Sequence, residues 1–577
     1  MRYPTLYSKE SSRQMVDTFK GYNHNLRIGE GEFFDMKNMT SDHYPVLSPR
    51  GNRGVYASPT SPNGLIAKDS LCYVDGTKFV INEYPVEMGL NDEPKQLISM
   101  GAYVIIMPDK KWINTLDTTK FGNIEASWES TGNVTFSLCT ISGEGYNDAS
   151  ASPTEPKEPQ NLQLWIDTSS TPHVLKQYSD ASAVWVSIAT TYIKITATGI
   201  GKAFEQYDGV TISGVTAEGV DLDGSMVIWG RGDDYIVVIG ILDEVTTQTE
   251  GTVKVQRTMP QMDYMTECDN RLWGCRYGLA ANGQVVNEIY CSKLGDFKNW
   301  NCFMGISTDS WVGGVGTDGP FTGAITHLGY PLFFKENCVH KVYGNYPANF
   351  QIQDTACRGV QKGCHKSLAI VNETLFYKSR SGVCAFDGSL PVEVSHALGD
   401  MHYGRAVAGS HGNKYYISMQ EAISPEYSLF VFDTAKGMWH KEDNFKAESF
   451  CSCDGEMYAI SGNKIITMLG SGTQDGDPVE WMAQTGEIGI SSPDMKYVSR
   501  VNVRMSMDIG AEVSIFAQYD YSDTWEPQCV LRGTNLRSFS IPIRPKRCDH
   551  MKLRIEGVGN VKIYSVTKTI EQGSDLS

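Results

Sequence analysis

The sequence predicts an all-β chain whose largest part is a β-propeller of about seven blades. The composition points to strands and turns, because the 577 residues include 56 glycines, 29 tyrosines, 21 phenylalanines and 11 tryptophans. A pattern of short apolar strands separated by turns rich in Asp, Asn or Gly recurs along the chain. A chain of this length is also too long to fold around a single hydrophobic core, so we expect several domains.

The repeated units follow one another with a single interruption. Their period is the main reason to expect a propeller, because the starts advance by about 40 residues from Ile325 onward, the length of one four-stranded blade. Each unit has an apolar face that it cannot bury alone, and stacking around an axis would bury it. The units span residues 64–85, 96–117, 266–300, 325–344, 368–388, 406–442 and 449–470.

Residues 269–278, DNRLWGCRYG, show how one unit is interpreted. Asp269 and Asn270 suit a turn, and the strand after it would place Trp273 between neighbouring blades. This leaves Arg271 and Arg276 as candidate contacts with another subunit or partner.

The remaining segments complete the predicted domain organisation. The Pro-rich stretch SASPTEPKEPQNLQ and the strand-like runs after it predict an inserted β domain within the propeller, and six alternating strands after about residue 475 predict a C-terminal β-sandwich. The predicted boundaries are an N-terminal, partly extended segment at 1–60, the first blades at 61–122, the inserted domain at 123–262, the remaining blades at 263–475 and the sandwich at 476–577.

The net charge and the cysteine content limit the classes of partner and of chemistry that we expect for the chain. A net charge of −17 argues against a protein that clamps the phosphate backbone of DNA, although an acidic wall would let DNA pass; ordinary solubility is the favoured explanation. The 14 cysteines are scattered and lie mostly in strand-like runs, so we expect buried free thiols. The first residues have no apolar segment of the kind a secretory signal needs, and we expect neither export nor a membrane span.

No motif predicts catalysis, a cofactor or a metal. Cys268 and Cys275, with His327 or His365, are spaced unlike usual zinc ligands. The segment STDSW at 307–311 lacks the glycine and the spacing of the Asp boxes found in some glycan-cleaving propellers. Since G-x-S-x-G, H-E-x-x-H and P-loop motifs are also missing from the sequence, we expect a protein that is not an enzyme.

Two surface features of the C-terminal region are candidate contacts. The basic segment PIRPKRC, with Arg544, Lys546 and Arg547, is interpreted as an edge strand whose charges prevent unwanted pairing, or alternatively as a salt-bridged contact with another subunit. The aromatic residues Tyr519, Tyr521 and Trp525 are candidate glycan contacts.

Several phrases of the sequence together resemble one protein family. They are FFDMKNMTSDHYPVLSPRGNRG (33–54), LWIDTSSTPHVLKQYSDASAVWVSI (164–188), and LGDFKNWNCF followed by GYPLFFKENCVHKVYG. These phrases are similar to the propeller-type tail nozzle, or stabilisation protein, of short-tailed phages.

The resemblance implies a virion protein made in the cytoplasm of a host bacterium. Its expected partners are copies of itself in a ring, with a hexamer expected, the adaptor or portal-side tail proteins, and tail fibres or a needle. Such a ring would sit at the distal end of the tail and close or continue the DNA channel, through which DNA would pass without specific binding. The alternative is a receptor-binding or glycan-binding tail module.

Overall fold

The computed structural model describes residues 11–146, 148–280, 282–471, 473–474, 478–491, 494–533 and 535–572. The chain is all-β, as predicted: its regular structure over these residues consists of strands and four short 3-10 segments, η1 to η4 (Ile200–Lys202, Pro347–Asn349, His365–Ser367 and His396–Leu398). No helix in this part of the chain is long and apolar enough to cross a membrane. The contacts divide the chain into two compact units, each described by itself.

Unit 2 comprises Gln96–Phe333 and His340–Asp354 and contains repeated four-stranded sheets. Strands follow one another in chain order within each sheet, as a β-meander requires. The first sheet consists of β11 (Gln96–Met100), β12 (Tyr103–Met107), β13 (Lys111–Asn114) and β14 (Phe121–Asn123), and the second of β28 (Tyr264–Cys268), β29 (Arg271–Leu279), β30 (Val285–Cys291) and β31 (Trp311–Gly314). A third sheet, whose residues fall in both units, consists of β32 (Gly323–His327), β33 (Tyr330–Lys335), β34 (Cys338–Tyr343) and β35 (Gln351–Ala356).

The first strands of consecutive sheets in unit 2 lie next to each other, β11 beside β28 and β28 beside β32. The side-chain amide of Gln96 donates to the carbonyl of Met265 at 2.7 Å, which ties the first two sheets together. Trp273 is buried between the second and third sheets, with its ring 6.0 Å from that of Trp311 and 5.1 Å from that of Phe350. The prediction that Trp273 fills the space between two repeated sheets is therefore confirmed.

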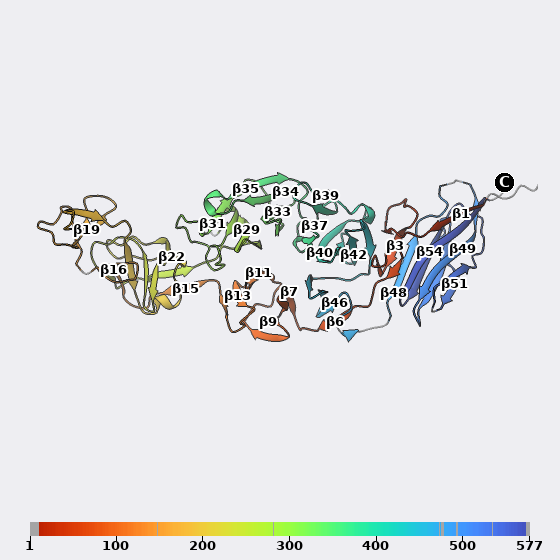
Figure 1. Ribbon diagram of the computed structural model, residues 1–577, viewed down its shortest axis with the longest axis horizontal. Coiled ribbons are helices and arrows are strands. Elements are labelled where there is room, and N and C mark those ends of the chain that lie inside the picture. The colour runs from red at the N-terminus through yellow and green to blue at the C-terminus, as the bar shows by residue number, and fades with distance from the viewer. Residues whose placement is uncertain are drawn as a thin grey trace, which may run out of the picture. The chain divides into compact units, whose positions relative to one another are not determined.

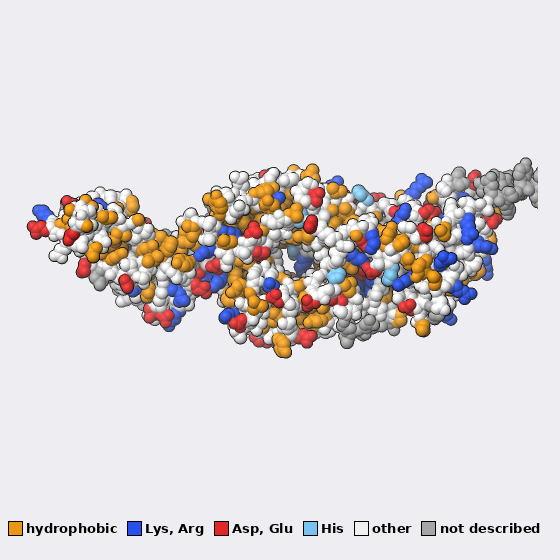
Figure 2. Space-filling model, viewed as in Figure 1, with side chains coloured by type: hydrophobic (Ala, Val, Ile, Leu, Met, Phe, Trp, Pro, Cys, Tyr) orange, Lys and Arg blue, Asp and Glu red, His pale blue; other side chains and the backbone are white. Residues whose placement is uncertain are grey.

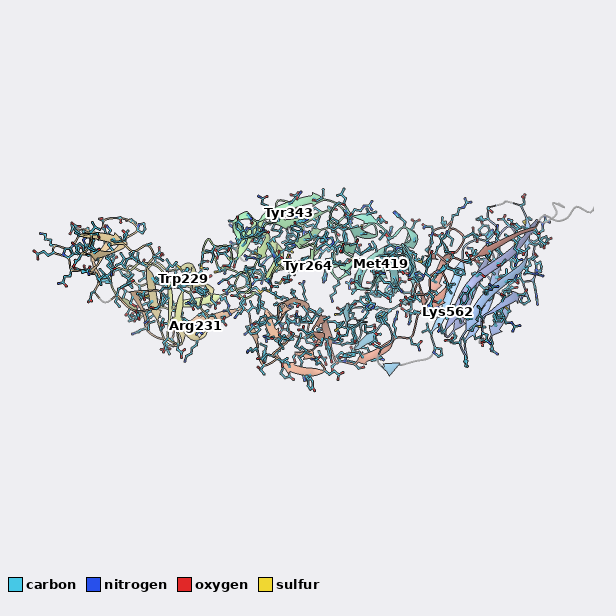
Figure 3. All side chains as sticks on the ribbon, in the orientation of Figure 1. Trp229, Arg231, Tyr264, Tyr343, Met419 and Lys562 are labelled. Atoms are coloured by element: carbon cyan, nitrogen blue, oxygen red, sulfur yellow. The ribbon has the colours of Figure 1, made fainter. Side chains whose placement is uncertain are left out.

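Between β14 and β28 lie the strands of the inserted region. Two sheets enclose an apolar core that includes Phe136, Ile195, Phe204 and Val255. The first is β15 (Ala126–Glu129), β27 (Lys254–Arg257), β22 (Gly209–Ser213) and β23 (Gly224–Val227); the second is β24 (Gly230–Gly232), β25 (Tyr235–Ile239), β21 (Tyr192–Thr196), β16 (Val134–Cys139) and β26 (Thr246–Gln248). Trp229, labelled in Figure 3, precedes β24, and its ring lies between those of Tyr192 and Tyr207 at 6.1 and 6.0 Å.

A smaller sheet, here called the small sheet, is built from residues within the same inserted region. Its strands are β17 (Ser150–Ser152), β18 (Leu164–Asp167), β19 (Val174–Ser179) and β20 (Val184–Ser187), in that order. β17 pairs with β18 in parallel, and the other two pairings are antiparallel. Figure 1 labels β19 in this sheet.

Unit 1 contains the other repeated sheets. Their first strands again lie next to each other, in the order β36, β40, β44 and β7. One sheet is β7 (Pro62–Lys68), β8 (Ser70–Asp75), β9 (Lys78–Ile81) and β10 (Tyr84–Glu87), and another is β36 (Ala369–Val371), β37 (Thr374–Lys378), β38 (Val383–Phe386) and β39 (Val392–Glu393). The strands β40 (Tyr403–His411), β41 (Lys414–Glu421), β42 (Tyr427–Asp433) and β43 (Met438–Lys441) begin a larger sheet.

One sheet of unit 1 combines strands from distant parts of the chain. The consecutive strands β44 (Ser449–Cys453), β45 (Glu456–Ser461) and β46 (Lys464–Thr467) are completed by β6 (Gly54–Ala57), with β47 (Thr473–Gln474) at the edge. Ala57 is opposite Ile465, and Gly54 is opposite Thr467. The N-terminal segment thus supplies the fourth strand of the last repeated sheet.

The N-terminal segment also joins a repeated sheet to the C-terminal strands. A ten-stranded sheet runs β40-β41-β42-β43-β2-β3-β48-β53-β50-β51, so β2 (Gly21–Tyr22) and β3 (Glu32–Lys37) lie between the two groups. Tyr22 is opposite Trp439, and Lys37 is opposite Met482. The other members are β48 (Glu480–Thr485), β50 (Glu512–Tyr519), β51 (Glu526–Arg532) and β53 (Met551–Val558).

A second C-terminal sheet has the order β1-β54-β49-β52. Burial alternates along β49 and β50, so each C-terminal sheet has one buried face. Figure 1 shows β48, β49, β51 and β54 in blue. The strands of this sheet are β1 (Ser11–Val16), β49 (Lys496–Met507), β52 (Arg537–Ile541) and β54 (Val561–Gln572), and a separate short pair is β4 (Met39–Thr40) with β5 (Ser48–Pro49).

Two local predictions for the C-terminal region are wrong. The prediction did not include β51, because Pro527 and a register shift opposite Ile515 and Phe516 disturb its alternation. The six predicted strands were 479–490, 497–509, 511–523, 538–543, 550–559 and 561–571. The predicted edge strand at PIRPKRC does not form, since residues 542–547 lie outside the strands. The blade number, the domain boundaries and the C-terminal sandwich stay predictions.

Candidate functional site

Arg271 does not face a partner, contrary to the expectation from the sequence. Its side chain is buried, with 2% of its surface exposed. One guanidinium nitrogen donates to the carbonyls of Ser292 at 2.8 Å and Asp309 at 2.6 Å, and the other donates to the carbonyl of Ser307 at 2.8 Å. Arg271 therefore holds the loop after β30 against β29.

The remaining features of that hairpin also have local roles. Arg276 is half-buried and donates to the carbonyl of Leu279 at 3.1 Å, so its role as a partner contact stays a prediction. Cys268 and Cys275 are buried thiols, and burial raises the pKa of the Cys268 thiol to about 12. In the part of the chain that the structure describes, no group of three or more His, Cys, Asp or Glu side chains is placed to hold a metal.

The three basic residues of the segment PIRPKRC are exposed. Figure 2 shows Lys and Arg side chains on the surface of the C-terminal strands, and Arg544, Lys546 and Arg547 are among the exposed residues there. Lys546 Nζ lies 2.5 Å from Glu526 Oε1, and this ion pair is within the chain. A contact between these three residues and another subunit stays a prediction.

The three predicted glycan contacts lie in different environments. The prediction that Tyr519 contacts glycan at the surface is wrong. Its side chain points to the buried face of β50 and is 8% exposed, and its hydroxyl donates to the Arg544 carbonyl at 3.1 Å. Burial, with a smaller contribution from Glu526, raises the pKa of Tyr519 to about 12. Tyr521 is 84% exposed in the turn after β50, with its ring 4.8 Å from His550. Trp525 is half-buried just before β51.

Trp525 belongs to a cluster on the outward face of the C-terminal strands. We call this cluster the Arg554 face and define it by Phe516, Trp525 and Arg554. Arg554 on β53 is directly opposite Phe516 on β50. The Arg554 guanidinium carbon lies 5.1 Å from the Phe516 ring centroid and 4.7 Å from that of Trp525, so the cation contacts both rings.

Polar groups border the Arg554 face. Arg554 Nε lies 3.2 Å from Glu556 Oε2, and Arg554 is also opposite Gln484 on β48. Lys552, two residues before Arg554 on the same face of β53, lies 3.6 Å from Glu487 Oε1. The face therefore combines partly exposed aromatic rings with charged and amide groups, which suits binding to a ligand with both apolar and hydroxyl surfaces.

Phe516 and Arg554 were not predicted as site residues, although the sequence contains a signal for them. Buried positions alternate in β50, so the outward residues are Ser514, Phe516 and Gln518, while Tyr519 is inward. Choosing exposed aromatics without this register selected Tyr519 and omitted Phe516. Arg554 lies 38 residues after Phe516, so its position beside Phe516 depends on the sheet order.

Comparisons with known proteins do not assign the chain to a family. No protein-family model matches it, and no curated protein matches it. Among solved structures, it is similar to an exo-β-1,3-galactanase from Phanerochaete chrysosporium (8% identity, 52% of this chain and 95% of that chain, TM-score 0.21) and to the endosialidase of phage phi92 (11%, 77% and 69%, TM-score 0.24). It is also similar to a glycoside hydrolase family 43 arabinoxylan arabinofuranohydrolase from Bacillus subtilis (9%, 52% and 94%, TM-score 0.17).

These similarities contradict the prediction that the chain is not an enzyme. All three solved proteins carry the names of enzymes, whereas the motifs missing from this sequence had predicted a chain without catalysis. At identities of 8 to 11% and TM-scores no higher than 0.24, the similarities assign no activity to this chain.

Proposed function

We propose that the chain is a phage tail protein that binds glycan on the host surface. The observation that carries the proposal is the Arg554 face, where Trp525 and Phe516 flank a guanidinium on an outward sheet face. The resemblance of residues 33–54 and 164–188 to tail proteins supports the virion context. The sequence also predicts Trp525 as a glycan contact, and the proposal keeps that role for it.

The chemistry of the Arg554 face suits a sugar. A sugar ring presents C–H groups that can pack on an aromatic ring and hydroxyls that accept from Arg or Lys. Because Phe516 holds the Arg554 guanidinium in place from one side, the cation loses little conformational freedom on binding. Trp525, just before β51, is half-buried like Phe516, so part of each ring is open to a ligand.

A glycan array probed with the full-length chain tests this proposal. Trp525→Ala removes the ring above Arg554, and we expect binding to fall at least about tenfold, equivalent to about 1.4 kcal/mol. Tyr84→Ala is the matched control, because Tyr84 is a 76% exposed aromatic residue on β10, away from the Arg554 face. Equal binding by the wild type and Trp525→Ala would show that the face is not the glycan site.

A second candidate function is a structural one, as a subunit of a tail nozzle ring with the adaptor, fibres or needle as neighbours. The ten-stranded sheet favours it, because β2 and β3 tie a repeated sheet to the C-terminal strands by backbone hydrogen bonds and make a stiff subunit. Cryo-EM of intact tails tests this role. Six copies around the distal end of the tail would support it, and density in the capsid shell or within a fibre would refute it.

We also infer that the repeated sheets are the blades of a seven-bladed propeller and that the two C-terminal sheets form a sandwich. The side-by-side first strands and the apolar clusters between consecutive sheets support the propeller. The alternating burial of β49 and β50 supports the sandwich. A cryo-EM map of the purified chain with another blade number would contradict the inference.

A further inference from the structure

The small sheet has two chemically different faces. Trp165 is opposite Lys176, and Tyr178 is opposite Trp185. Because side chains two positions apart on a strand share a face, these four residues and Asp167 all lie on one face. We call it the Trp185 face.

The opposite face of the small sheet supplies its apolar core. Ile166 and Leu175 are buried there with Leu138 of β16, and Ile188 packs against the same cluster. The sheet is thus attached to the rest of the inserted region through this face. Since one buried face is enough to anchor a small sheet, the aromatic residues of the Trp185 face are not needed for that attachment.

The aromatic rings of the Trp185 face contact one another. The Trp185 ring centroid lies 5.3 Å from that of Trp165 and 5.3 Å from that of Tyr178. Trp165 is buried under this cluster and donates its indole N–H to the Ser152 carbonyl at 3.0 Å. Trp185 and Tyr178 remain partly exposed and can meet a ligand, and Trp165 supports the Trp185 ring from below.

A charged pair lies beside the rings. Lys176 Nζ is 2.8 Å from Asp167 Oδ2 and 4.9 Å from the Trp165 ring centroid. Asp167 Oδ1 also accepts from the backbone N–H of Ser169 at 3.0 Å and from its hydroxyl at 2.6 Å. The hydrogen bond from the Lys176 ammonium, followed by those from Ser169, lowers the pKa of Asp167 to about 2, so the carboxylate is ionised and the pair has no net charge at neutral pH.

We propose that the Trp185 face binds the pyranose rings of a neutral polysaccharide, with Trp185 and Tyr178 as stacking surfaces and Lys176 and Asp167 as hydrogen-bonding partners for sugar hydroxyls. The neutral Lys176–Asp167 pair favours an uncharged glycan over an acidic one, because an anion would compete with Asp167 for the ammonium. This inference rests on the proposed glycan-binding function and adds a second surface, on a different unit of the chain from the Arg554 face.

The experiment is affinity electrophoresis of the native full-length chain in gels that contain dextran, galactomannan, a mixed-linkage β-glucan or, as the acidic probe, polysialic acid. We expect retardation by at least one neutral polysaccharide. Trp185→Ala should weaken the apparent affinity at least about tenfold, and Trp185→Tyr should keep part of it because a ring remains. Lys176→Met should weaken it by a smaller factor.

Val186→Ser is the matched control. Val186 lies next to Trp185 on β20, is 52% exposed and points to the opposite face, so its replacement alters the same strand and not the aromatic face. Retardation should be unchanged in this variant. Thermal unfolding of each variant shows whether it is folded. If Trp185→Ala does not fold, Lys176→Met and Trp185→Tyr provide the test.

Other outcomes would overturn the inference. They are the same retardation for Trp185→Ala and the wild type, retardation by polysialic acid alone, and no retardation by any neutral polysaccharide. A change in the sedimentation coefficient of Trp185→Ala without a change in retardation would instead identify a contact with a second copy. Loss with Trp525→Ala but not with Trp185→Ala would leave the proposed function standing and refute this second surface.

Discussion

Arg271 illustrates how an arginine in a turn-flanking position becomes part of the core. Its three carbonyl partners belong to the chain after β30, so the residue fixes a long loop that no regular strand holds. A buried guanidinium is tolerated when carbonyl oxygens satisfy its donors. Sequence alone could not show this, because the partners lie 21 to 38 residues away.

Arg271→Ala should destabilise the chain by about 3 kcal/mol or more, because the buried hydrogen bonds to the Ser292 and Asp309 carbonyls and the partly buried one to the Ser307 carbonyl are lost at once. Arg276→Ala, five residues later on the same strand, should change the free energy of unfolding by less than about 0.5 kcal/mol, since Arg276 is partly exposed with one hydrogen bond. Urea unfolding followed by tryptophan fluorescence compares the two variants. Similar values for both would contradict the role given to Arg271.

The aromatic residues show a different limit of prediction at this scale. Trp273 was placed correctly because a tryptophan in a repeated strand has to fill the space between sheets. Tyr519 was placed wrongly because a shift of one residue in strand register exchanges the inner and outer faces. Residue type predicts that an aromatic side chain contributes to packing or binding, while the strand register decides on which face of the sheet it lies.

At the scale of elements, the repeated sheets were predicted well because their signal is local. All strands of the repeated sheets except β6 follow one another in chain order, so a strand finds its partner a few residues away, and the turn residues mark where it ends. The strands that sequence analysis did not assign to sheets are those with distant partners. β2, β3 and β6 pair with strands hundreds of residues later, and no periodicity records such a pairing.

β6 gives the element-scale prediction. A Cβ atom on Gly54 would meet Thr467 Oγ1 at 2.5 Å and the Ser471 carbonyl oxygen at 2.6 Å. Gly54→Ala should therefore push β6 from β46 and cost about 1 to 3 kcal/mol. Gly51→Ala is the control, because nothing lies within 4 Å of its Cβ position and the change should be neutral or slightly stabilising.

Chemical unfolding of both glycine variants provides the measurement, and proteolysis within residues 50–60 is an independent readout of a loosened β6. If Gly54→Ala unfolds at the same denaturant concentration as Gly51→Ala, the fit of β6 against β46 is less close than the structure indicates.

At the scale of the whole molecule, the cysteines report on packing throughout the chain. All 14 are thiols, and ten of them are buried; Cys357, Cys451, Cys453 and Cys529 are partly exposed. Burial raises the pKa of Cys451 to about 12 and of Cys357 to about 11, which keeps them as unreactive thiols at neutral pH. The thiols thus act as small apolar side chains.

Labelling with a thiol-reactive disulfide reagent at pH 7.5 tests this description. We expect no more than four thiols to react in the native protein within minutes, and all 14 after unfolding in urea without a reductant. Fast reaction of more than four would show that the repeated sheets open readily. Fewer than 14 in urea would reveal disulfides.

The pairing of β6 with β46 also sets an order of events during synthesis. Residues 54–57 leave the ribosome before their partner at residues 464–467, which is made only after some 400 further residues have been added. At roughly 5 to 20 residues per second, the wait is about 20 to 80 seconds. Throughout that time β6 lacks this partner, and a cell that makes many copies at once offers it the β46 strand of a neighbouring chain whose own β6 has not yet paired. Nascent copies can therefore exchange this strand with one another, and a lower level of the messenger RNA would make the exchange less frequent.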